Sequence, residues 1–239
     1  MWLALETATD RASVAVGESA ADAVEESLTG ARRHAGAVLP MIDAALRRRG
    51  VTLDHLNGIL VSDGPGSFTG LRVGASVAKA LARARALPLW TAPSLVVRAA
   101  GLANAGPSLV LAVADALRGD LYATAVRFRD GRVRLELEPG VWRPDALAEL
   151  NLEPDVLVGE APPAAAAVLM ERTGLELIGP PAGAPQAVKL IELAAMEGGI
   201  RKVEDALGWE PVYGRPAEAQ ARWESAHGRP LPDSVGGSR

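Results

Sequence analysis

The chain has 239 residues, 49% of them apolar, with two Phe, two Tyr, no Cys and a net charge of −4. This length allows one large domain or two lobes, whose cores must be filled mainly by Ala, Leu and Val. The lack of Cys excludes disulfides, thiol catalysis and cysteine-ligated metals, and the acidic balance is unlike the basic surface of an autonomous nucleic-acid-binding protein. No signal peptide precedes the first apolar run and no run approaches the roughly 20 residues that span a bilayer, so we expect a cytoplasmic protein without membrane contact.

The first part of the chain predicts short strands followed by alternating helices and strands. Apolar runs at 2–5, 12–16 and 23–28 predict an opening meander. An amphipathic helix is predicted at His34–Arg49, because its apolar residues recur at helical spacing and Gly50 ends it. The elements predicted next are a strand at 59–61, a helix at 68–86, a strand at 89–91 and a helix at 93–103.

The pattern starts again after a linker at 104–108. An apolar strand at 109–114 closes on Asp115, as the first strand closes on Glu6. The elements predicted next are a hairpin of 121–128 and 132–138, helices at 144–150, 163–172 and 184–196, and a strand at 156–158. This repeat predicts two related lobes, 1–104 and 105–208. The tail, 209–239, is expected to return partly to the first lobe and to be disordered at its end.

The most specific segment is 63–74 (DGPGSFTGLRVG). Two Gly around a Pro predict a tight turn, and a helix capped by Ser67 or Thr69 follows at once. Free amides at a helix N-terminus attract anions, so phosphate binding is one hypothesis. The segment is neither a Walker loop, because no Lys-Ser/Thr follows the last Gly, nor a dinucleotide fingerprint, because Gly70 falls one residue too late.

The helix predicted at 68–86 also carries a stripe of small residues at every fourth position: Gly70, Gly74, Ala78, Ala82 and Ala86. Such a stripe lets another backbone approach closely, and the sequence leaves open whether this is the protein's own sheet or a partner helix. If it is a partner, Gly74→Leu should block association while leaving the monomer folded. A neighbouring polar stripe is expected to stay in water: Arg72, Ser76, Lys79 and Arg83.

Catalytic groups are hard to assemble from this sequence. None of the three His has a partner at i+4 that would chelate a metal on a helix face, and Ser67 lacks the Gly-x-Ser-x-Gly elbow of hydrolases. The acids that close the two apolar strands, Glu6 and Asp115, are either turn residues or acids over a phosphate cleft that would hold hydrated magnesium.

Four motifs resemble the TsaB (YeaZ) family, the non-catalytic subunits of bacterial tRNA threonylcarbamoyladenosine biosynthesis. They occur in order at 3–9 (LALETAT), 64–72 (GPGSFTGLR), 115–122 (DALRGDLY) and 211–213 (PVY). The resemblance covers residues 3 to about 225 and depends most on the GPGSFTGLR string. It implies an α/β protein of the actin/Hsp70/sugar-kinase (ASKHA) fold, with two ribonuclease-H-like lobes that each have a mixed sheet and flanking helices.

The resemblance also implies a role as scaffold. The chain would bind and stabilise the catalytic paralogue TsaD, together with the small ATPase TsaE, for modification of the adenosine next to the anticodon. It would form a homodimer in isolation and meet tRNA only through the complex. No cofactor is expected on the chain alone; ATP and a divalent metal are expected in the partner subunits. The partner-binding residues implied on the two first-lobe helices are His34, Val38, Met41, Ile42, Phe68, Leu71, Arg72, Gly74, Ala75 and Ala78.

Two further expectations come from comparison with the family. Glu6, Thr7 and Asp115 would form a vestigial phosphate site. In the catalytic paralogue an Asn-His-x-x-x-His motif helps to hold a metal, and its two His positions fall here on Ser94 and Arg98. A hydroxyl is a poor metal ligand and a guanidinium donates only, so we expect no metal, no catalytic residue and a pseudoenzyme subunit.

The sequence departs from the family pattern at three positions, and these departures weaken the case for nucleotide binding. Glu6 replaces the usual Asp, Asp63 precedes the glycine turn where a basic residue is common, and Leu117 replaces an Arg. An autonomous ATPase or kinase of the same fold, using Glu6 and Asp115, remains the alternative. A peptidase lacks a plausible catalytic constellation, and tRNA binding by the tail (Arg215, Arg222, Arg229, Arg239) is opposed by the overall acidity.

Overall fold

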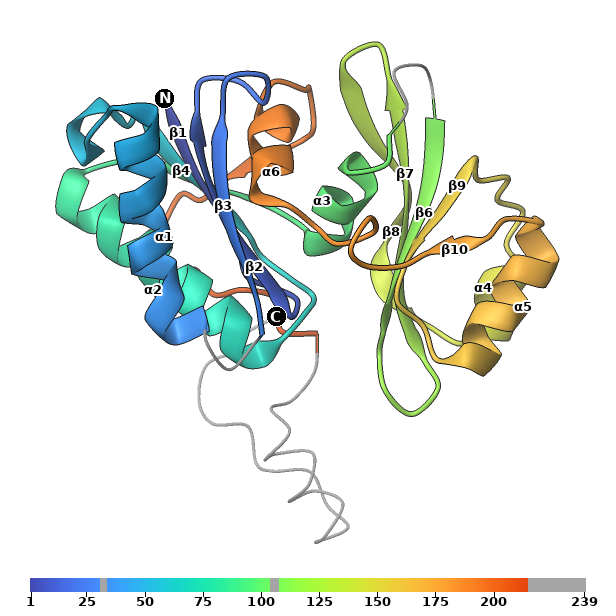
Figure 1. Ribbon diagram of the computed structural model, residues 1–239. Coiled ribbons are helices and arrows are strands. Elements are labelled where there is room, and N and C mark those ends of the chain that lie inside the picture. The colour runs from blue at the N-terminus through green and yellow to red at the C-terminus, as the bar shows by residue number, and fades with distance from the viewer. Residues whose placement is uncertain (31–33, 104–107, 215–239) are drawn as a thin grey trace, which may run out of the picture.

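The computed structural model describes residues 1–30, 34–103 and 108–214. Two lobes lie side by side, each built on a mixed β-sheet (Figure 1). The first sheet has the strand order β11-β5-β4-β1-β2-β3 and the second has the order β10-β9-β6-β7-β8. Apart from the edge strand β11, the two orders are the same, which confirms the predicted internal repeat.

In the first repeat, β1 (Trp2–Glu6) pairs antiparallel with β2 (Arg11–Gly17), which pairs antiparallel with β3 (Val24–Thr29). Its parallel strands are β4 (Gly58–Ser62) and β5 (Leu89–Ala92). The helices α1 (His34–Arg49), α2 (Phe68–Arg85) and α3 (Ser94–Ala100) follow β3, β4 and β5 in turn, with a short 3-10 turn, η2 (Leu53–His55), after α1.

The second repeat follows the same course. Its strands are β6 (Ser108–Asp115), β7 (Leu121–Arg129), β8 (Arg132–Trp142), β9 (Val156–Gly159) and β10 (Leu177–Ile178). Its helices are α4 (Pro144–Glu149), α5 (Pro163–Thr173) and α6 (Ala187–Ala194), and β11 (Arg201–Lys202) follows. The outer helices of the lobes are α1 and α2 on the first sheet and α4 and α5 on the second (Figure 1).

Three hydrophobic clusters hold these layers together. Alternation along β1 sends Leu3 and Leu5 toward α1 and α2, while Ala4 faces the other lobe. A second cluster joins the second sheet to α4 and α5. The third contains residues of both sheets and of α3 and α6, so the lobes share a common core.

The third helix of each repeat packs on the sheet of the other repeat. Helix α3 contacts β6 and β7, whereas α6 contacts β1 and β2 and lies against α3. The strand after α6 also belongs to the first sheet, where Arg201 pairs with Thr91. The predicted boundary of the second lobe at residue 208 is therefore wrong, because the chain has already returned to the first lobe at α6.

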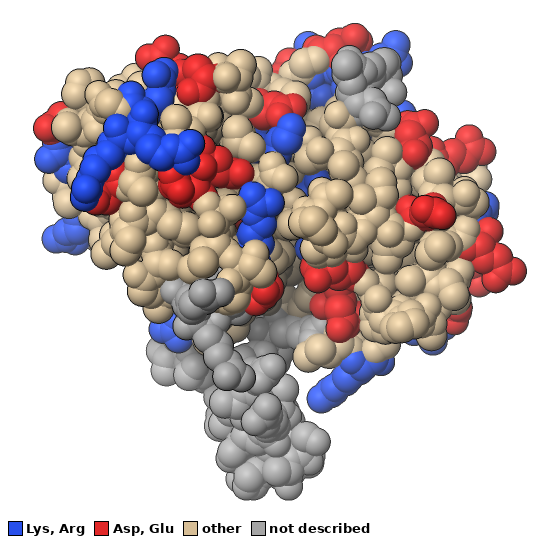
Figure 2. Space-filling model, viewed as in Figure 1, with Lys and Arg blue, Asp and Glu red and all other residues tan. Residues whose placement is uncertain are grey.

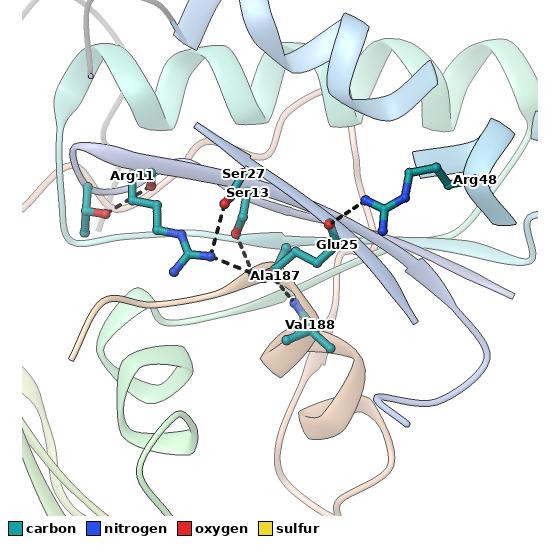
Figure 3. A network of polar contacts seen from close by, with 8 residues as sticks. Arg11, Ser13, Glu25, Ser27, Arg48, Ala187 and Val188 are labelled. Atoms are coloured by element: carbon teal, nitrogen blue, oxygen red, sulfur yellow. Dashed lines mark hydrogen bonds and ion pairs between the residues drawn. The ribbon is translucent and has the colours of Figure 1, made fainter. Parts of the chain in front are cut away.

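Tertiary contacts cap the start of α6 (Figure 3). The side chain of the preceding residue, Gln186, does not cap the helix. Instead, the N–H of Ala187 donates to Ser13 Oγ at 2.8 Å, and the N–H of Val188 donates to Glu25 Oε1 at 3.1 Å. These bonds satisfy helix N–H groups that have no partner within the helix and place a carboxylate at its positive end. Residues of β2 and β3 thus hold a segment from the end of the chain.

Most predicted elements are confirmed within about two residues, with α1 at its predicted bounds. The helix predicted at 93–103 ends earlier, at Ala100, and α6 begins later than residue 184. The short elements η2, β10 and β11 were not predicted. The predicted linker at 104–107 and the predicted disordered end of the tail lie outside the described residues. No helix in the described ranges combines the length and apolar character needed to cross a bilayer.

Candidate functional site

The glycine turn after β4 is held by bonds within the chain. The N–H of Gly64 donates to Ser94 Oγ at 3.0 Å, and the N–H of Ser94 donates back to the Gly64 carbonyl at 2.8 Å. Gly64 has φ of 99°, and Ser67 donates its N–H to the Ala8 carbonyl at 2.7 Å. Ser67 caps α2 as predicted, because its hydroxyl accepts from Gly70 N–H at 3.2 Å. Several amides that the phosphate hypothesis would use are therefore already occupied.

The small-residue stripe of α2 packs on the protein's own first sheet. A Cβ at Gly70 would lie 2.0 Å from the Thr7 carbonyl oxygen, and one at Gly74 would lie 2.4 Å from Thr7 Oγ1. The Thr7 hydroxyl donates to the Gly70 carbonyl at 2.8 Å, and Ala78 and Ala82 are buried beneath the helix. The partner-helix interpretation of the stripe is therefore wrong. The expectation that Gly74→Leu leaves the monomer folded is wrong for the same reason.

Most of the residues implied as partner contacts are also buried within the chain. They lie against the first sheet and its neighbours: Val38, Met41, Ile42, Leu71, Gly74, Ala75 and Ala78. Their side chains build the monomer core, so a partner could not reach them in this arrangement. Phe68 is partly exposed and Arg72 is exposed, whereas the His34 side chain lies outside the described atoms.

The outer surface between α1 and α2 carries different residues. A groove of about 490 Å³ is lined by Ala35, Phe68, Thr69, Arg72, Val73, Ser76 and Val77. Leu39 of α1 is 58% exposed. Sequence reasoning missed Val73 and Val77 because each stands directly between a residue of the polar stripe and a residue of the buried stripe. Their spacing alone does not tell which side of the helix meets water.

The strap, which we define as residues 207–214, runs along the other side of α2. Lys79 forms an ion pair with Glu210 at 2.8 Å and lies 5.8 Å from the Trp209 ring centroid. The rings of Phe68 and Tyr213 are 4.7 Å apart, and the Arg72 guanidinium lies 5.4 Å from the Phe68 ring. The described part of the tail therefore lies against α2 of the first lobe and contacts Phe68, which lines the groove.

Hydrogen bonding tightens the strap further. The Tyr213 hydroxyl donates to Glu210 Oε2 at 2.9 Å, and burial together with this bond raises the pKa of Tyr213 to about 12. The N–H of Val212 donates to the Asp63 carbonyl at 2.7 Å. The strap is thus fastened both to α2 and to the glycine turn that precedes it.

The three residues expected to form a vestigial phosphate site are not brought together. Glu6 is fully buried and faces the inter-lobe side, whereas Thr7 points to α2 on the opposite face of the sheet. Asp115 is exposed at the end of β6, where its Oδ1 accepts from Leu117 N–H at 2.6 Å. Leu117 and Arg118 both have positive φ in this turn, at 54° and 56°.

Glu6 is a buried acid on the inter-lobe side of the first sheet, and its pKa is strongly raised. Its Oε1 accepts from Ala8 N–H at 2.7 Å. Its Oε2 makes no hydrogen bond of ordinary geometry to a described residue, although the Ser62 hydroxyl lies near it. Burial raises the pKa of Glu6 to about 7, against smaller opposing effects of Ser62, the Ala8 amide and the Arg98 charge. Below about pH 7 this carboxyl is therefore largely protonated in the folded protein.

The two positions at which metal-binding His were looked for, Ser94 and Arg98, make contacts within the chain. Ser94 Oγ accepts from Gly64 N–H, and Arg98 is only 2% exposed. Arg98 Nη1 donates to the Val113 carbonyl at 3.2 Å, and Nη2 pairs with Glu160 Oε2 at 3.0 Å. Within the ranges that the structure describes, no three His, Cys, Asp or Glu side chains are grouped as a metal would require.

The charged surface shows both signs close together (Figure 2). The basic end of α1 is paired with acids, because Arg47 contacts Asp43, Arg48 contacts Glu26 and Arg49 contacts Asp22. The face in Figure 2 presents no continuous basic stripe of the kind that follows a phosphate backbone.

Comparison with known proteins agrees with this arrangement. A family model described as "TsaD: tRNA N6-adenosine threonylcarbamoyltransferase" matches residues 28–166. The tRNA threonylcarbamoyladenosine biosynthesis protein TsaB of Haemophilus influenzae is 30% identical, and the match covers 95% of this chain and 97% of that protein. The chain belongs to the TsaB (YeaZ) family. The Escherichia coli TsaB protein is 33% identical over 65% of this chain and 63% of its own length.

A solved structure supports the fold directly. YeaZ from Pseudomonas aeruginosa superposes with a TM-score of 0.72 at 28% identity, covering 89% of this chain and 98% of that chain. The expected α/β fold of two lobes, each with a mixed sheet and flanking helices, is thereby confirmed. The TsaB family also places the chain among homologues of proteins for tRNA threonylcarbamoyladenosine biosynthesis.

Proposed function

We propose that this TsaB-family chain is a non-catalytic scaffold subunit that binds and stabilises a TsaD-type catalytic subunit through the groove between α1 and α2. The observation that carries the proposal is the exposed apolar surface of these helices, formed by the groove and Leu39. Isolated exposed apolar residues are common, but a groove lined by Phe68, Val73 and Val77 next to such a residue is typical of a protein interface.

The inter-lobe side supports the non-catalytic part of the proposal. Glu6 is buried and has a raised pKa, the Ser94 hydroxyl accepts a hydrogen bond from the glycine turn, and Arg98 forms an ion pair with Glu160 of the second lobe. ATP and a divalent metal would accordingly be bound by the partner subunits, TsaD and TsaE, and tRNA would be met through the complex. In isolation the same groove would serve a homodimer. An autonomous ATPase or kinase is the weaker candidate, because Glu6 and Asp115 do not face one site.

The test is complex formation with a purified TsaD-type subunit, measured by size-exclusion chromatography with light scattering. Ser76 is an exposed groove residue, so Ser76→Arg should prevent the complex without disturbing the core. Ala167→Arg on α5 is the matched control, since it adds the same charge to an exposed helix position of the second lobe. A complex that tolerates Ser76→Arg, or threonylcarbamoyl transfer to tRNA by this chain alone, would refute the proposal.

A further inference from the structure

Helix α3 is fastened to both lobes by residues one helical turn apart. At its start, Ser94 exchanges two hydrogen bonds with Gly64 of the first lobe, at 3.0 and 2.8 Å. Four residues later, Arg98 donates to Val113 and pairs with Glu160, both of the second lobe. Since a single helical turn is rigid, the two anchors hold the carboxyl ends of β4 and β6 at a set separation.

The second lobe is shaped to receive the guanidinium of Arg98. Gly159 ends β9 with φ of 135°, and a Cβ there would lie 2.8 Å from Arg98 Nη1 and 1.8 Å from the Val113 carbonyl oxygen. Only glycine fits such a backbone beside a buried charge. The neighbouring Glu160 turns its carboxylate to Arg98 while remaining 51% exposed.

A buried guanidinium would be strongly unfavourable without these partners. Here it is bonded to a carbonyl and a carboxylate of the second lobe. The apolar core shared by the lobes is non-directional and allows small sliding movements. Hydrogen bonds have a defined geometry and restrict such movements. The polar contacts of Arg98 therefore add a directional restraint that the apolar core does not provide.

We propose that α3, through its anchors Ser94 and Arg98, is an inter-lobe strut that fixes the angle between the lobes without any bound ligand. The positive charge of Arg98 joins the helix to the carboxyl ends of β6 and β9 in the second sheet, while Ser94 joins it to the end of β4 in the first. The strut concerns the inter-lobe side and does not depend on the groove between α1 and α2. The chain would therefore hold one lobe arrangement whether or not a partner is bound.

Paired spin labels can test the strut, because the natural sequence has no Cys. Cysteines introduced at Arg83 of α2 and Glu171 of α5 are exposed and lie on different lobes. Pulsed electron paramagnetic resonance then gives the inter-lobe distance distribution. With Arg98 and Glu160 intact we expect one narrow distribution. Arg98→Met and Glu160→Arg should each broaden it or shift its maximum.

The Glu160 variant keeps the test decisive if Arg98→Met fails to fold. Glu160 is half exposed, so its replacement should leave a cooperative unfolding transition while placing a second positive charge against Arg98. Glu176→Arg is the matched control, because it changes an exposed acid of the same lobe and should leave the distribution narrow. An unchanged distribution in folded Glu160→Arg would overturn the proposal, and so would a broad distribution before any substitution.

Discussion

A side chain at Gly74 would begin 2.4 Å from the hydroxyl oxygen of Thr7, where α2 crosses the end of β1. This contact shows that the small-residue stripe of α2 packs inside the monomer. Thr7 is fully buried and donates its hydroxyl hydrogen to Gly70, so the threonine cannot turn away without losing a hydrogen bond. The stripe lets α2 lie close to its own sheet.

Gly74→Ala should therefore lower the free energy of unfolding by about 1–3 kcal/mol, the usual cost of overpacking a filled core. The matched control is Gly36→Ala on α1, because nothing lies within 4 Å of a Cβ at Gly36. That variant should gain about 0.5–1 kcal/mol from the better helix propensity of Ala. Urea denaturation measures both, and equal effects at the two sites would contradict the close approach of Thr7.

The buried carboxyl of Glu6 should make stability depend on pH. Its pKa is raised from 4.5 to about 7, so the folded protein retains a proton that the unfolded chain releases near pH 4.5. The contribution of Glu6 is fully present below pH 4.5, is lost as the pH rises to about 7 and stays lost above that, amounting to up to about 3 kcal/mol.

Glu6→Gln should remove this component and flatten the stability curve between those pH values. Burial also raises the pKa of Asp63, which forms an ion pair with Arg201 at 2.9 Å, so the Glu6→Gln variant should keep some slope from that group. The difference between the wild type and Glu6→Gln isolates Glu6. If the two curves of unfolding free energy against pH run parallel, Glu6 is ionised in the folded state.

The cap of α6 predicts a stability effect at a distant strand. Ser13→Ala leaves the buried N–H of Ala187 without its partner, so we expect a loss of about 1–2 kcal/mol. Ser27→Ala is the control on the neighbouring strand, because its bond to Arg11 is exposed and should contribute under about 0.5 kcal/mol. Hydrogen exchange should show faster opening of α6 in Ser13→Ala only; slow exchange in both would mean that α6 is capped in another way.

The ring contact between the strap and α2 can be separated from its hydrogen bond. Tyr213→Ala removes the ring that lies 4.7 Å from Phe68 and should cost about 1–2 kcal/mol. Tyr213→Phe keeps the ring and loses only the bond to the exposed Glu210, so its melting temperature should stay near that of the wild type. A large loss in Tyr213→Phe would show that the hydroxyl, and not the ring, holds the strap.

Local patterns in the sequence predicted much of the fold. The spacing of apolar residues and Gly50 set the bounds of α1, and the alternation in β1 sent Leu3 and Ala4 to opposite faces. The repeat of apolar strands closing on an acid indicated two lobes, and the two sheets share the same strand order.

The remainder depended on contacts between distant segments. Arg201 and Lys202 carry no apolar pattern, and they form β11 only because β5 offers a free edge. Arg98 and Glu160 are 62 positions apart, so no local rule pairs them. The stripe of Gly and Ala predicted that another part of a chain lies close to α2. Only the position of Thr7 shows that this is the end of β1 of the same protein.

The exchange of third helices bears on the order in which the lobes can form during synthesis. The second sheet comes from one continuous stretch, from β6 to β10, whereas the first sheet also needs α6, β11 and the strap. Although its residues are made first, we therefore expect the N-terminal half to complete its fold only after α6, β11 and the strap have been made. Until then the inner face of β1 and β2 lacks its covering helix, and the nascent chain exposes apolar surface that chaperones recognise.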